Sequence, residues 1–192
     1  MISDIGYGLN SLAHFLLLLL LFTVRKPGVA KHLLVLATAT TVFWSSSMIS
    51  TVFGPVSLSW LLTADAMKQL AWLLFLAGCI QDNFTSIRQV LLRPVTMFIV
   101  LPGLFAFIIP NLIWIDASWR YLMLIVLSLE ILILLEVLYA DNDQWAYKPL
   151  VLYLGATHLF EFVTYANATM VNQVEVGYLA ARGYIYFLLI PF

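Results

Sequence analysis

Charged residues are scarce in this sequence. Only 10% of the 192 residues are Asp, Glu, Lys or Arg, whereas 63% are hydrophobic. A soluble domain needs more polar surface than this composition supplies, so the sequence indicates a membrane protein. The net charge is −1, so no basic excess is present to bind nucleic acid. The single cysteine, Cys79, excludes an internal disulfide bond and a cysteine-based metal site.

The sequence also lacks the short motifs of soluble catalysis. It contains no Gly-rich phosphate loop, no metal-ligand spacing and no nucleophile elbow. We therefore expect no bound cofactor and no metal ion, and we assign no catalytic residue.

Long apolar runs, by contrast, are abundant. A helix needs about 20 apolar residues to cross a hydrocarbon core of about 30 Å, and six stretches reach that length. The seventh rises only about 24 Å, so we expect the chain to be cut inside or just after it. The stretches are residues 4–24, 30–53, 58–80, 94–115, 119–140, 149–171 and 177–192. They predict an all-α fold, a seven-transmembrane helix bundle that forms one sensor domain over residues 1–192.

Basic residues mark every second loop between these stretches. One set of loops carries Arg25, Lys26, Lys31, Arg88, Arg93 and Lys148, and the opposite side carries only Arg120 and Arg182. Loops rich in Lys and Arg stay in the cytoplasm. We therefore predict an N-terminus outside the cell membrane and a cytoplasmic C-terminus.

Ionisable side chains lie inside several predicted helices. Asp65 and Lys68 are three residues apart, and Glu161 and Tyr165 are four apart. Both spacings place the pair on one helix face. Arg182 lies at a similar depth in the seventh stretch, so the opposite charges can cancel if these helices adjoin. We predict a polar cluster of these five residues in the outer half of the membrane.

Three roles are open for this cluster. Ionisable groups inside a bilayer are costly, usually face the bundle interior and are often functional. The five residues could be structural ion pairs that fix helix packing. They could instead form a ligand- or signal-sensing pocket open to the periplasm, or part of a proton or ion path.

A series of short motifs runs from the third stretch to the end of the chain. They are Leu70–Leu76, Glu136–Tyr139, Trp145–Lys148, Phe160–Ala168, and Ala181–Gly183 followed by Pro191. In order and spacing they resemble the N-terminal membrane region of PrsK-type sensor histidine kinases, which are associated with the PEP-CTERM/exosortase system of Gram-negative bacteria. Two features depart from the family pattern. Glu161 stands where the family has an aspartate, and no kinase half is present.

The resemblance implies a signal-input domain of a two-component sensor histidine kinase in the inner membrane. The phosphoacceptor histidine and the ATP-binding domain would lie beyond Phe192, and none of His14, His32 and His158 has the context of a phosphoacceptor. Whether the protein is an enzyme is thus left open. The implied partners are the lipid bilayer and, through the kinase half, a cytoplasmic response regulator of exopolysaccharide or envelope genes. A homodimer is compatible with the resemblance, since sensor kinases are usually dimers.

Other functions remain open from the residues alone. The chain could be a small stand-alone transporter or channel, or a partner-binding membrane protein. A transporter often shows repeats or matching broken helices, and no repeat is visible. A third alternative is an integral membrane enzyme or haem protein, since His14 and His158 both fall near mid-depth and could ligate haem iron.

Overall fold

The fold was analysed in a computed structural model that describes residues 2–24, 28–50, 54, 57–80, 86–112, 114–141 and 148–190. Within these ranges the regular structure is entirely helical, so the all-α prediction is confirmed there. The helices are α1 (Ile2–Thr23), α2 (Val29–Ser47), α4 (Leu58–Ile80), α5 (Ile87–Leu91), α6 (Pro94–Ile108), η1 (Ile109–Asn111), α7 (Ala117–Asp141), α8 (Lys148–Val171) and α9 (Val176–Leu188).

Each apolar stretch of the sequence corresponds to one long helix, with differences at the ends. The third has the predicted bounds, whereas the second ends at Ser47, short of residue 53. The fourth ends early because Pro110 cannot continue an α-helix, and a 3₁₀ turn replaces it. The seventh ends at Leu188. Arg25, Lys26, residues 145–147 and Pro191, which carried sequence predictions, lie outside the described residues.

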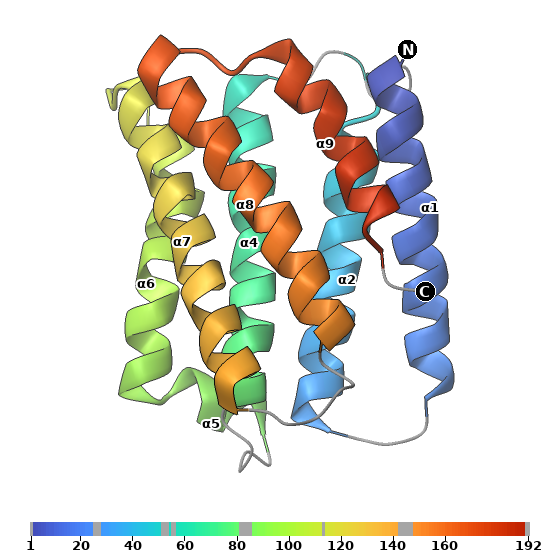
Figure 1. The fold of residues 1–192 in the computed structure, drawn as a ribbon. Coiled ribbons are helices and arrows are strands. Elements are labelled where there is room, and N and C mark those ends of the chain that lie inside the picture. Colours follow the sequence, from blue (N-terminus) through green and yellow to red (C-terminus); the bar gives the residue numbers. More distant parts are fainter. Residues whose placement is uncertain are drawn as a thin grey trace.

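The long helices pack side by side and run in alternating directions along the chain (Figure 1). The central helix is α4, which packs against α2, α6 and α7. The strongest pairings beyond it are α7 with α8 and α1 with both α2 and α9. The first and last described helices are thus neighbours, although they lie at opposite ends of the sequence.

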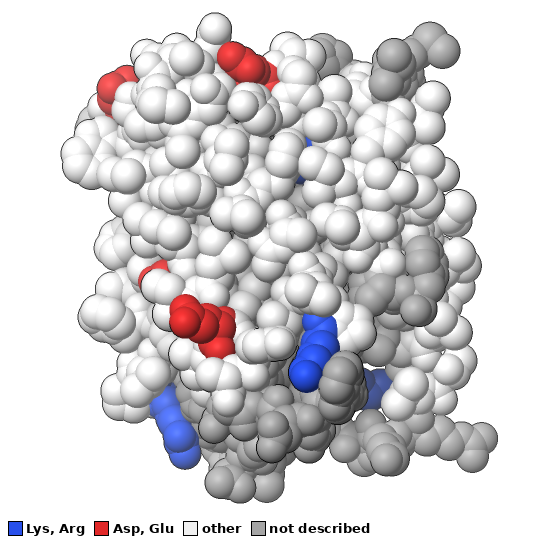
Figure 2. All heavy atoms as spheres, viewed as in Figure 1, with Lys and Arg blue, Asp and Glu red and all other residues white. Residues whose placement is uncertain are grey.

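Four of the helices are long and apolar enough to cross a membrane. These spans are Ser3–Thr23, Leu58–Ile80, Pro94–Asn111 and Ala117–Ala140. Figure 2 shows the matching surface: the charged atoms on this face lie mostly toward its two ends, and a broad uncharged band lies between them. Both observations indicate a membrane protein.

Burial is reversed relative to a soluble protein. Phe22, Phe98 and Leu152 are 65%, 78% and 70% exposed, whereas Asp65 and Arg182 have no exposed surface. In water this arrangement would expose large apolar side chains and desolvate charges at the same time. In a bilayer it is favourable, because lipid solvates the apolar outside and the polar groups face one another inside.

Glycine allows α1 and α9 to approach closely. A Cβ atom on Gly183 would lie 2.7 Å from the backbone nitrogen of Tyr7 and 2.9 Å from the carbonyl carbon of Gly6. Neither backbone atom can move without moving the whole of α1. Small residues permit such contacts between membrane helices, so Gly183 sets the spacing of this pair.

We therefore expect Gly183→Ala to lower the free energy of unfolding by about 1–3 kcal/mol, as overpacking does. Gly8→Ala is the matched control, because a Cβ there meets nothing within 4 Å. The control should be neutral or stabilise by up to about 1 kcal/mol through helix propensity. Thermal unfolding of both variants in detergent, followed by circular dichroism, tests this. Equal effects of the two substitutions would contradict the close approach.

Candidate functional site

Two ion pairs lie in the interior of the bundle. Arg182 Nη1 is 2.6 Å from Asp65 Oδ2, and Lys68 Nζ pairs with Glu161 Oε1. All four side chains are completely buried. Their charges sum to zero, so the interior holds two cations and two anions without net charge. This is the condition under which buried charges are tolerated in an apolar medium.

Helical spacing brings these side chains to one level. Asp65 and Lys68 lie about one turn apart on the buried face of α4, as do Glu161 and Tyr165 on α8. Arg182 is on the buried face of α9. The structure thus brings together all five residues of the predicted cluster. Their assignment as a sensing site stays a prediction.

The Asp65 carboxylate is surrounded by donors from three other helices. Trp44 of α2 donates its indole N–H to Oδ1, and Tyr165 of α8 donates its hydroxyl to Oδ2. Arg182 completes the set and also donates to the Tyr165 hydroxyl at 3.1 Å. Asp65 therefore connects α4 to α2, α8 and α9 through charge-assisted hydrogen bonds, which are the stronger class.

Glu161 has an equally complete set of partners. Gln69 Nε2 lies 2.5 Å from Oε2, and the Tyr186 hydroxyl donates to Oε1 at 2.7 Å. Lys68 donates both to this carboxylate and to the Tyr186 hydroxyl, the latter at 2.8 Å. Both oxygens of each buried carboxylate thus accept at least one hydrogen bond, as burial of a charge requires.

The indole ring of Trp44 joins the two ion pairs. Lys68 Nζ lies 3.8 Å from the ring centroid, and Arg182 Cζ lies 4.9 Å from it. Cations are attracted to the face of an indole ring, and this attraction is strongest where water is excluded. Trp44 therefore stabilises both cations while its N–H group binds Asp65. We call Trp44, Asp65, Lys68, Gln69, Glu161, Tyr165, Arg182 and Tyr186 the buried charge network.

Sequence reasoning missed three members of this network: Trp44, Gln69 and Tyr186. A usable signal existed for Tyr186, which is four residues after Arg182 and so shares its helix face. Gln69 directly follows Lys68 and gives no such periodic signal. Trp44 is on a helix without charged neighbours in its middle, and nothing in its spacing marks it as a partner of Asp65.

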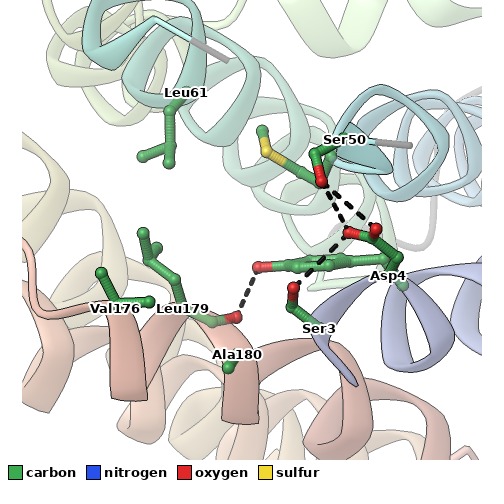
Figure 3. A pocket seen from close by; sticks show the side chains of 9 residues that line it. Ser3, Asp4, Ser50, Leu61, Val176, Leu179 and Ala180 are labelled. Carbon is green, nitrogen blue, oxygen red and sulfur yellow. Dashed lines mark hydrogen bonds between the residues drawn. The ribbon is translucent and has the colours of Figure 1, made fainter. Parts of the chain in front are cut away.

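A pocket lies at the end of the bundle where α1 and α9 begin. Its cavity volume is about 200 Å³, and its lining residues are Ser3, Asp4, Tyr7, Met48, Ser50, Leu61, Val176, Leu179 and Ala180. Figure 3 shows Asp4 and Ser50 pointing toward each other across one side of it. Ser50 Oγ donates to the two Asp4 carboxylate oxygens at 3.0 and 3.2 Å. The pocket therefore has a polar side and an apolar side.

Tyr7 connects this pocket to the buried charge network. Its side chain lines the pocket, and its hydroxyl donates to the backbone carbonyl of Leu179 at 2.8 Å (Figure 3). The same hydroxyl accepts a hydrogen bond from Arg182 Nε at 3.4 Å. A change in the pocket that moves Tyr7 would thus act on α9 at two points, its backbone and its buried arginine.

The two histidines considered as haem ligands are engaged in other ways. His14 Nε2 lies 2.9 Å from the Tyr153 hydroxyl, and His14 Nδ1 lies 3.0 Å from the carbonyl of Asn10. His158 Nδ1 lies 2.9 Å from the carbonyl of Leu154. Because both ring nitrogens of His14 have partners, the arrangement favours packed, hydrogen-bonded histidines over a pair of axial ligands.

The chemistry of the described residues is one of charge and hydrogen bonding. Among them, no group of three or more His, Cys, Asp or Glu side chains is placed to hold a metal ion. No family model, curated protein or solved structure matches this chain. The role of the site is therefore inferred from its own geometry and from the short motifs in the sequence.

The bond from Trp44 to Asp65 can be tested with a matched pair of substitutions. Trp44 and Trp72 are both buried, but Trp72 donates its indole N–H to the neutral hydroxyl of Thr41 at 3.0 Å. Trp→Phe removes the same volume at each site. We expect Trp44→Phe to lower the free energy of unfolding by about 1–2 kcal/mol more than Trp72→Phe, because its lost bond is to a carboxylate. Thermal unfolding in detergent measures both, and a larger loss for Trp72→Phe would refute this role of Trp44.

Proposed function

We propose that the chain is a seven-span membrane domain with its N-terminus outside and its C-terminus in the cytoplasm. Among the described residues, seven long helices alternate in direction, which supports this topology (Figure 1). The helices α2 and α8 carry buried polar residues that lower their hydropathy but face the interior. The 24 residues of α8 reach about 36 Å, enough for a bilayer.

The distribution of basic residues supports the same orientation. Lys31, Arg88, Arg93 and Lys148 all lie in or beside the segments that join the helices at one end of the bundle, whereas Arg120 is at the other end. The first end would face the cytoplasm. The pocket lined by Tyr7 would then open outside, and the buried charge network would lie below it within the membrane.

Within this topology, the domain receives a signal for a sensor histidine kinase. The short motifs from Leu70 to Pro191 support membership in the PrsK-type kinases of Gram-negative inner membranes. The structural observation that carries the proposal is the position of Tyr7, which belongs to the pocket and also contacts Arg182. An outside pocket and a buried network thus share one side chain, and both involve α9.

Signal transfer would proceed as a shift between two helix arrangements. A ligand acts only if it binds one arrangement better than the other. In the network, Arg182 Nη2 is buried and has no hydrogen-bond partner among the described residues. The guanidinium therefore has a spare donor with which to exchange partners when α9 moves. Helix α9 would pass this movement to the cytoplasmic kinase half, and from there to a response regulator.

The first test of this proposal is the reading frame of the native gene beyond the Phe192 codon. We expect it to continue into a phosphoacceptor histidine and an ATP-binding domain. A natural stop codon with no kinase gene nearby would overturn the sensor-kinase proposal and favour a stand-alone transporter or partner-binding protein.

The second test asks whether the pocket is coupled to the kinase. Tyr7→Phe removes only the hydroxyl that contacts Leu179 and Arg182, so we expect autophosphorylation of the full-length protein in vesicles to change severalfold, as coupling energies of about 1–3 kcal/mol imply. Tyr178→Phe is the control, since it changes the same residue type on α9 away from the network. Equal autophosphorylation in wild type and Tyr7→Phe, with intact expression, would disprove coupling through Tyr7.

A further inference from the structure

A second cavity lies on the surface between α7 and α8, at the end opposite to the Tyr7 pocket. Its volume is about 370 Å³. The residues that matter here are Leu132, Glu136 and Tyr139 of α7, and Lys148, Leu152 and Gly155 of α8. We call this cavity the α7–α8 groove. Figure 2 shows acidic atoms over α7 and basic atoms over the start of α8, near the lower end of this face.

Polar and apolar residues in the α7–α8 groove are sorted by depth. Lys148 is the first residue of α8, and Glu136 and Tyr139 lie in the last two turns of α7. Leu132 is nine residues before the end of α7, and Gly155 is seven residues after the start of α8, which places them about 13 and 10 Å deeper. The groove therefore has a charged mouth at the level of lipid headgroups and an apolar floor at the level of the acyl chains.

The floor of the α7–α8 groove is open to the side of the bundle. A Cβ atom on Gly155 would meet nothing within 4 Å, and Leu152 is 70% exposed. No described side chain fills this space. Because α7 is one of the helices able to cross a membrane, the medium next to the groove would be lipid.

The mouth of the α7–α8 groove carries both signs of charge. Glu136 supplies a carboxylate from α7, and Lys148 supplies an ammonium group from α8 that lies 5.9 Å from the centroid of the Tyr139 ring. An anionic lipid without an ammonium group would satisfy Lys148 but would be repelled by Glu136. A headgroup with a phosphate and a terminal ammonium complements both residues.

We propose that the α7–α8 groove binds a zwitterionic aminophospholipid of the phosphatidylethanolamine class. The phosphate lies at Lys148, the ammonium group at Glu136, and one acyl chain lies along Leu132 and past Gly155. This site depends on the membrane placement of α7 but not on the sensor-kinase role. A stop codon after Phe192 would therefore leave it unaffected.

Native mass spectrometry of the purified chain, titrated with phosphatidylethanolamine or phosphatidylglycerol, tests the proposal. We expect the wild type to bind phosphatidylethanolamine about tenfold more tightly, the equivalent of about 1.4 kcal/mol. Glu136→Gln should abolish that preference by removing the partner of the ammonium group. Equal binding of the two lipids by the wild type, or an unchanged preference in Glu136→Gln, would overturn the proposal.

Two further variants separate the headgroup from the acyl chain. Gly155→Leu should reduce binding of both lipids, because the new side chain fills the floor of the groove without a clash. Glu130→Gln is the matched control, since Glu130 is a second acidic residue of α7 and does not line the groove. The control should keep the wild-type preference. If Glu130→Gln lost the preference as fully as Glu136→Gln, or if Gly155→Leu folded and bound both lipids as the wild type does, the site would be wrongly placed.

Discussion

Four charged side chains must neutralise one another inside a bundle whose outer surface is apolar. Asp65 pairs with Arg182, and Glu161 pairs with Lys68, all without exposure to solvent. An unpaired charge in such a medium costs several kcal/mol, so each helix that carries one is held to the helix that carries its partner. This requirement fixes α4, α8 and α9 relative to one another. Trp44 adds α2 to the same unit through its indole ring and N–H group.

The same requirement accounts for the composition of the individual helices. The central helix α4 carries two buried charges and packs against α2, α6 and α7, so it is shielded from lipid on most of its surface. In α8 the buried positions include His158, Glu161 and Tyr165, whereas its exposed positions include Leu152, Leu159 and Val163. Average hydropathy therefore understates the fitness of α8 for a membrane, because its polar residues point inward.

Periodicity and charge balance were enough to predict the helices and five members of the buried charge network. Spacings of three and four residues along the sequence place Asp65 with Lys68, and Glu161 with Tyr165, on shared helix faces. Which cation pairs with which anion could not be predicted, because it depends on how the helices neighbour one another. Trp44 was missed for the same reason: it contacts Asp65 only because α2 packs on α4. The early end of the second helix at Ser47 also escaped prediction, since residues 48–53 are as apolar as a helix requires.

The neutral, coupled pairs are the central claim, and a double-substitution cycle on Lys68 and Glu161 tests them most directly. Lys68→Met and Glu161→Gln should each lower the free energy of unfolding by about 3–5 kcal/mol, because each leaves one buried charge without its partner. The double variant removes both charges, so it should recover most of that loss when thermal unfolding is measured in detergent. Small single effects that simply add in the double variant would contradict a buried ion pair between α4 and α8.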